Sequence, residues 1–184
     1  MKYTPLPSRP WQRIAANLCE LDEKHFLVVI DYLSRFIEIA FLPSITSAQV
    51  IGKMKNIFAR WGIPEELVSD NGTQFTSEAF HLFAADCKFR QTYTSPHYPQ
   101  SNGEAESAVN IAKRILRQDD IFKGLLSYRN TPKEATGQSP AELVMGRKLR
   151  TLVPTLPEKL KPEWMDHDNV FLRDQIDGAL QILL

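Results

Sequence analysis

The chain has 184 residues, 43% of them hydrophobic and 10% aromatic, which is enough to bury the core of one domain with tails. Its 22 basic and 22 acidic side chains cancel, which argues against a strongly basic nucleic-acid binder but is compatible with a local phosphate-binding patch. The sequence has no apolar run of the roughly 20 residues that cross a bilayer, no signal-peptide pattern and no CxxC spacing at its 2 cysteines. We therefore expect an intracellular protein without a membrane span or a zinc site.

The first part of the chain predicts an arm followed by three strands. Prolines within residues 1–10 disfavour a helix, so we expect an extended arm there. Apolar runs at 14–19, 26–31 and 36–42 are separated by short polar segments. This pattern predicts a meander of three antiparallel strands.

The hydrophobic period then changes to that of helices. The expected elements are a helix capped at 46–47 and stopped at 62–64, a strand at 67–69, a helix starting at 76–77, a strand at 89–93, a loop at 96–103, a helix at 104–118, and helical segments at 121–128 and 140–145. Residues 11–150 are therefore predicted to form an α/β domain with a mixed five-stranded sheet flanked by helices. Residues 151–184, first rich in proline, then acidic and finally apolar, predict a linker and a poorly packed tail.

Two acidic residues lie at the ends of predicted elements. Asp70 follows the strand at 67–69, and Glu106 lies in the first turns of the helix at 104–118. Taken alone, each is more often a turn residue or a solvated charge. Carboxylates that meet across a sheet, however, make an oxygen-only site suited to Mg²⁺. Two such ions about 4 Å apart can activate a hydroxyl and stabilise a leaving oxygen in phosphoryl transfer.

Six sequence blocks occur in a fixed order between residues 9 and 157: WQRI at 11–14, FLVVIDYLSR at 26–35, WGIP at 61–64, SDNGTQF at 69–75, SPHYPQSNG at 95–103, and GQSP at 137–140 with GR at 146–147. These blocks resemble the catalytic core of retroviral and gypsy-type retrotransposon integrases. The resemblance implies a ribonuclease-H-like fold, a two-metal site of Asp, Asp and Glu that takes Mg²⁺ or Mn²⁺, and DNA strand transfer. It also implies DNA as a partner, a homodimer and a nuclear location.

The resemblance matches Asp70 and Glu106 to the second and third carboxylates of the metal site, but Asn17 stands where the first Asp belongs. Strand alternation predicts that the Asn17 side chain points where a ligand would. An amide oxygen coordinates a cation without supplying charge, so we expect weak metal binding at most and absent or much reduced strand transfer. Asp31 is a strand-end acid beside Ser34 and is expected to be structural.

Polar residues around Glu106 are predicted to contact DNA. The set comprises His97, Tyr98, Gln100, Asn102, Asn110, Lys113 and Arg117. The last three share a helix face with Glu106, which suits backbone phosphates. The alternatives are a solvated helix face and, for His97, a hydrogen bond that orders the loop.

Three functions stay open. The leading one is a retrotransposon-derived integrase core that binds nucleic acid through a weakened metal site. The second is a non-enzymatic DNA- or protein-interaction scaffold domesticated from an integrase, and the third is an active integrase fragment. The sequence shows neither the zinc module nor the C-terminal DNA-binding module of a complete integrase, so we expect a stand-alone core.

Overall fold

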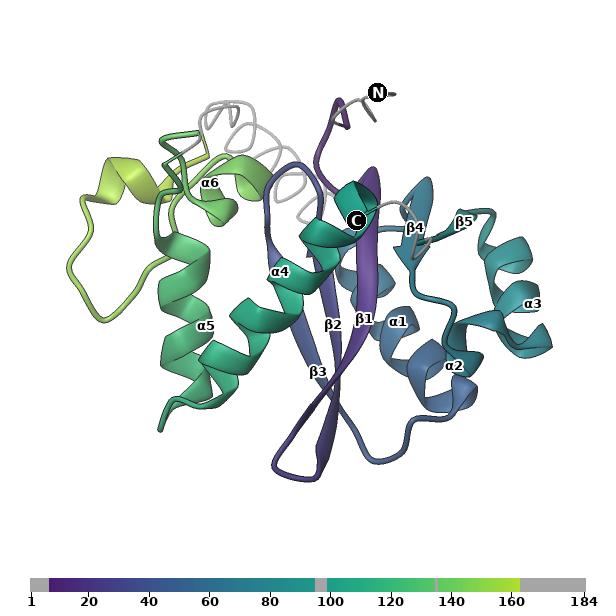
Figure 1. The fold of residues 1–184 in the computed structure, drawn as a ribbon. Coiled ribbons are helices and arrows are strands. Elements are labelled where there is room, and N and C mark those ends of the chain that lie inside the picture. Colours follow the sequence, from purple (N-terminus) through teal and green to yellow (C-terminus); the bar gives the residue numbers. More distant parts are fainter. Residues whose placement is uncertain (1–6, 95–98, 135, 163–184) are drawn as a thin grey trace, which may run out of the picture.

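The computed structural model describes residues 7–94, 99–134 and 136–162, with the side chains of 99–106 left out. A five-stranded sheet in the order β3-β2-β1-β4-β5 lies at its centre (Figure 1). The strands are β1 (Arg13–Leu21), β2 (Lys24–Asp31), β3 (Ile37–Leu42), β4 (Glu66–Ser69) and β5 (Arg90–Tyr93). The pairs β1–β2 and β2–β3 are antiparallel, whereas β1–β4 and β4–β5 are parallel. The predicted mixed sheet with an antiparallel meander is therefore confirmed.

Helices pack against both faces of the sheet (Figure 1). They are α1 (Ser47–Trp61), α2 (Thr73–Thr76), α3 (Glu78–Cys87), α4 (Pro99–Leu116), α5 (Ile121–Asn130) and α6 (Pro140–Met145), followed by the 3-10 helix η1 (Pro157–Leu160). One core cluster joins the sheet to α1, α2 and α3, and a second joins it to α4 and α5. None of the helices in the described part of the chain is long and apolar enough to cross a membrane.

The central strand β1 is buried on both faces, and its alternating side chains divide between the two core clusters. Ile14 and Ala16 belong to the cluster with α1 and α3. Ala15 and Cys19 belong to the cluster with α4, where they meet Ala112 and other small side chains of that helix. Small residues on the helix allow α4 to lie close over β1.

An arginine of α5 binds the edge strand β3 through two kinds of contact. The Arg129 guanidinium donates through Nε and Nη2 to the Ile37 carbonyl at 3.1 and 2.8 Å, and it also pairs with Glu38 at 3.2 Å. Glu38 accepts a further bond of 2.7 Å from the indole nitrogen of Trp61 at the end of α1. Helices from opposite faces of the sheet therefore meet at one carboxylate on β3.

One predicted boundary is wrong, and one helix was not predicted. The predicted loop at 96–103 is helical from Pro99 onwards, and residues 96–98 lie outside the described part of the chain. Proline suits the first turn of a helix, because its missing N–H has no intrahelical partner there. The single-turn helix α2 was not predicted. The predicted helix start at 76–77 is confirmed, because α3 begins after Ser77, whose hydroxyl accepts the Phe80 N–H at 3.2 Å.

Asp31 has the structural role that the sequence predicts. It is fully buried and accepts the backbone N–H groups of Trp11 at 3.0 Å and Ser34 at 2.8 Å, together with the Ser34 hydroxyl. These bonds tie the segment that enters β1 to the turn between β2 and β3.

Replacing Asp31 with alanine is expected to destabilise the fold. An unsatisfied buried donor costs about 1–3 kcal/mol, and Asp31→Ala leaves the N–H groups of Trp11 and Ser34 without their acceptor. The expected loss of unfolding free energy is at least about 2 kcal/mol, measured by urea denaturation. Asp119→Ala, at an exposed position, serves as the control. Equal denaturation midpoints for the two variants would contradict the role given to Asp31.

Candidate functional site

The parallel pairing of β1 with β4 brings Asn17 and Asp70 to the same level of the sheet. The ladder runs from Arg13 opposite Glu66 to Ala16 opposite Ser69. Asn17 is the next residue of β1 and Asp70 directly follows the end of β4, and neighbouring strands lie about 4.8 Å apart. Asn17 shares the α4 face of β1 with Ala15 and Cys19 by alternation. The sheet itself therefore positions the first two members of the predicted site.

The Asp70 carboxylate is held by a tight turn. Its Oδ1 accepts the Gly72 N–H at 2.9 Å, and the Gly72 carbonyl accepts the N–H groups of Phe75 and Thr76 at 2.9 and 3.1 Å as α2 begins. A Cβ on Gly72 would lie 2.8 Å from Asp70 Oδ1 and would overlap the Gln74 side chain, so a larger residue here would displace one or both of these side chains. Asp70 is exposed, and its Oδ2 accepts no hydrogen bond from the described residues.

Asn17 is buried at this site, with 9% of its surface exposed. Its Nδ2 is buried and has no acceptor among the described residues. A carboxylate would carry no N–H to satisfy and would present two acceptor oxygens instead. The buried amide nitrogen is thus an unsatisfied donor among the described residues, which a carboxylate at this position would not introduce. The oxygens of Asn17 and Asp70 match Mg²⁺ or Mn²⁺ in kind, but together they carry only one negative charge.

Helix α4 carries Glu106 over the same face of the sheet. Ala108 and Ala112 of this helix belong to the core cluster that contains Ala15 and Cys19 of β1. The backbone positions of Gln100, Asn102 and Glu106 lie on α4, but their side chains lie outside the described part, as do His97 and Tyr98 altogether. Among the side chains that the structure describes, no three or more His, Cys, Asp or Glu residues gather to hold a metal.

The basic residues of α4 lie at different depths. Lys113 is half-buried and close to Cys19: burial raises the pKa of that thiol, and the Lys113 charge opposes the shift. Asn110 is exposed, and so is Arg117, which lies beyond the last residue of the helix and donates its N–H to the Lys113 carbonyl at 3.1 Å.

Sequence reasoning missed two side chains that hold the segment after Asp70. Gln91 and Tyr93 of β5 both donate to the Phe75 carbonyl, at 2.8 and 3.3 Å. Only the register between β4 and β5 places them there, and no local pattern around 91–93 signals it.

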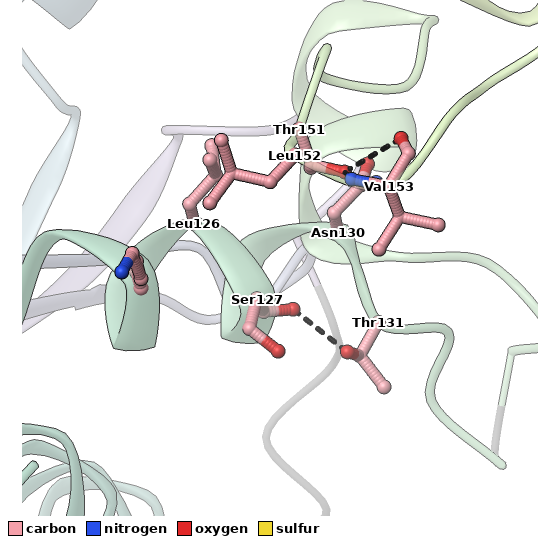
Figure 2. Close-up of a pocket in the computed structure, with 8 residues that line it drawn as sticks. Leu126, Ser127, Asn130, Thr131, Thr151, Leu152 and Val153 are labelled. Carbon is pink, nitrogen blue, oxygen red and sulfur yellow. Dashed lines mark hydrogen bonds between the residues drawn. The ribbon is translucent and has the colours of Figure 1, made fainter. Parts of the chain in front are cut away.

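A pocket of about 280 Å³ lies between α5 and residues 151–153 (Figure 2). Leu126, Leu152 and Val153 supply much of its lining, and Lys123 is its charged residue. None of the predicted site residues lines it. It contains no carboxylate, so it is separate from the site around Asp70.

Comparison with known proteins identifies the family. The integrase core domain family matches residues 3–99, which is more than half of the chain. An uncharacterized protein of Caenorhabditis elegans is 38% identical over 166 residues, covering 83% of this chain and 13% of that protein. The Gag-Pol polyprotein of Walleye dermal sarcoma virus is 30% identical over 177 residues, covering 88% of this chain and 10% of the polyprotein. The chain thus spans only about a tenth of the length of these relatives.

Solved structures show the same fold. The catalytic core domain of BIV integrase matches with a TM-score of 0.63 at 21% identity, covering 74% of this chain and 95% of that one. The catalytic core domain of HTLV-2 integrase, solved in complex with magnesium, matches with a TM-score of 0.62 at 16% identity, covering 74% and 97%. The predicted ribonuclease-H-like fold is therefore confirmed. The chain belongs to the integrase core domain family, of the retroviral and retrotransposon type.

Proposed function

We propose that this chain is an integrase core that binds DNA, holds a divalent cation weakly and has little or no strand-transfer activity. The observation that carries this proposal is the β1–β4 register, which ends at Ala16 opposite Ser69 and so places Asn17 and Asp70 one residue further on, with the Asn17 amide nitrogen buried and without an acceptor among the described residues. Asp70 supplies one exposed carboxylate to a cation, and Glu106 on α4 is proposed to supply the second.

The proposed loss of activity follows from charge. A bound Mg²⁺ or Mn²⁺ would supply Lewis-acid stabilisation of phosphoryl oxygens. Asp70 and Glu106 would orient it, whereas Asn17 would add a neutral oxygen where this family uses a carboxylate. Losing one negative charge a few ångströms from a dication costs on the order of several kcal/mol of electrostatic attraction, because water screens charges only weakly in a partly dehydrated site. Magnesium in the HTLV-2 core supports this choice of metal.

DNA binding is proposed to rest on backbone phosphates beside this site. Two basic residues and one amide support such contacts: Lys113 is half-buried on α4, Asn110 is exposed on the same helix, and Arg117 is exposed just beyond its end. Gln100 and Asn102 on α4, together with His97 and Tyr98, are proposed to extend this surface. A homodimer and a nuclear location belong to the same proposal. A non-enzymatic scaffold is the second candidate, which the neutral Asn17 favours.

The variant Asn17→Asp tests the proposed loss of catalysis. Restoring the carboxylate is expected to raise Mg²⁺- or Mn²⁺-dependent strand transfer at least about a thousandfold, which corresponds to roughly 4 kcal/mol of transition-state stabilisation. The measurement is joining of labelled DNA ends to a target duplex by the purified protein. The double variant Asn17→Asp with Asp70→Asn is the matched control. It has the same net charge as the native protein but lacks the carboxylate at position 70. Comparable rates for native protein and Asn17→Asp would refute the proposal.

The variants Lys113→Ala and Arg117→Ala test the DNA surface. Each removed phosphate contact is expected to reduce the slope of log affinity against log salt by roughly 0.9 for duplex DNA, without changing sequence preference. Fluorescence anisotropy of a labelled duplex at several KCl concentrations measures this slope. Lys53→Ala on α1, across the sheet, is the control and should leave it unchanged. If Lys113→Ala and Arg117→Ala both give the native slope, as the control does, α4 is not the DNA-binding face.

A further inference from the structure

Three successive hydrogen-bonded contacts, joined through the backbone of Gly72 and Phe75, lead from the Asp70 carboxylate to the edge strand β5. Asp70 Oδ1 accepts from the Gly72 N–H, and the Gly72 carbonyl accepts from the Phe75 N–H at 2.9 Å. The Phe75 carbonyl is the far end of this unit, and it accepts from Gln91 and Tyr93 of β5. The position of the carboxylate is thereby linked to β5 through the peptide groups of one turn and one short helix.

Helix α2 is unable to hold this position by itself. It has only 4 residues and no side-chain cap at its Gly72 N-terminus. A helix of this length is unstable in isolation, because nucleation fixes several residues for one hydrogen bond. Its place is set by tertiary contacts: the buried Phe75 ring meets Phe80 edge-on with centroids 5.4 Å apart, and the Phe75 carbonyl meets β5.

The Gln91 amide is oriented by this carbonyl. Its Nε2 donates to the Phe75 oxygen at 2.8 Å, while its Oε1 is buried and has no donor among the described residues. Turning the amide over would set Oε1 against the Phe75 carbonyl oxygen, two acceptors facing each other. The observed orientation therefore satisfies Phe75 and leaves the Gln91 oxygen unsatisfied.

Tyr93 extends the chain of hydrogen bonds to α3. Its hydroxyl lies 3.3 Å from the Phe75 carbonyl, to which it donates, and 2.8 Å from His81 Nε2. Because a phenol has one proton, both bonds form together only in the His81 tautomer that donates from Nε2. Burial raises the pKa of the Tyr93 phenol, which keeps it protonated and able to donate. In that tautomer His81 occupies the Tyr93 oxygen from the neighbouring helix and leaves the hydroxyl proton to the Phe75 carbonyl.

We propose that Gln91, Tyr93 and His81 are positioning residues for the Asp70 carboxylate, acting through the Phe75 carbonyl. These three side chains and that carbonyl are here named the Phe75 clamp. The clamp holds the Phe75 end of α2. Because the Phe75 N–H donates to the Gly72 carbonyl, this also holds Gly72, whose own N–H donates to Asp70 Oδ1. The inference rests on the proposed function only in treating Asp70 as a cation ligand.

Amide hydrogen exchange tests the clamp without any metal. In Tyr93→Phe the exchange of the Gly72, Phe75 and Thr76 amides is expected to be roughly fivefold faster, and about 25-fold faster in the double variant with Gln91→Met. Tyr93→Phe decides the test if the double variant does not fold, because it removes one oxygen from a half-buried side chain.

Thr92→Val is the matched control. It removes a bond of 2.7 Å from the same strand, but that bond runs to Glu66 of β4 and not to Phe75. Exchange at the three amides is expected to stay within about twofold of native in this variant. Exchange that is no faster in Tyr93→Phe than in Thr92→Val would overturn the inference.

Metal affinity distinguishes a positioning role from a merely structural one, because a merely structural role would leave the affinity unchanged. In the Asn17→Asp protein, Mn²⁺ titrated calorimetrically is expected to bind about fivefold more weakly when Tyr93→Phe is added, and with native-like affinity when Thr92→Val is added. Faster exchange with unchanged Mn²⁺ affinity would overturn the positioning role. Failure of Asn17→Asp itself to bind Mn²⁺ would count against the proposed function, while the exchange measurement still decides the clamp.

Discussion

The parallel ladder between β1 and β4 is the constraint on which the site depends. It sets Asn17 level with Asp70, and it makes β1 a central strand with cores on both faces. A register shift of one residue would turn every β1 side chain to the other face, moving Asn17 into the α1 core and an apolar neighbour into the site. The relative positions of Asn17 and Asp70 therefore cannot change without disrupting the packing on both faces of the sheet.

Charged groups pin this ladder at the end opposite Asp70. Glu66, the first residue of β4, pairs with Arg13 of β1 at 3.3 Å and Arg90 of β5 at 3.0 Å and accepts the Thr92 hydroxyl at 2.7 Å. Burial raises the pKa of Glu66, but the hydrogen bonds from Thr92 and Arg90 and the charge of Arg13 outweigh it and lower the pKa. The carboxylate consequently stays charged at neutral pH and joins three adjacent strands, which lose this support only as the pH falls through its lowered folded-state pKa.

The sequence predicts most of the sheet because its strands are apolar runs bounded by polar turns, and it predicts Asp70 because a local motif surrounds it. Its errors have physical causes. Helix α2 is too short to show a 3.6-residue period, and the first turn of α4 is rich in Pro, Ser, Asn and Gly, which are typical of loops. The Phe75 clamp depends on the register of β4 with β5, a long-range property that no local pattern encodes.

A metal titration measures the consequence of Asn17 most directly. Native protein and Asn17→Asp would be titrated calorimetrically with Mn²⁺ and then Mg²⁺, with Asp70→Asn as the reference for a site that lacks its exposed carboxylate. The lost charge predicts that Asn17→Asp binds at least about a hundredfold more tightly than native protein, equivalent to roughly 2.7 kcal/mol. Equal affinities in the native and Asn17→Asp proteins would contradict the claim that this amide weakens the site.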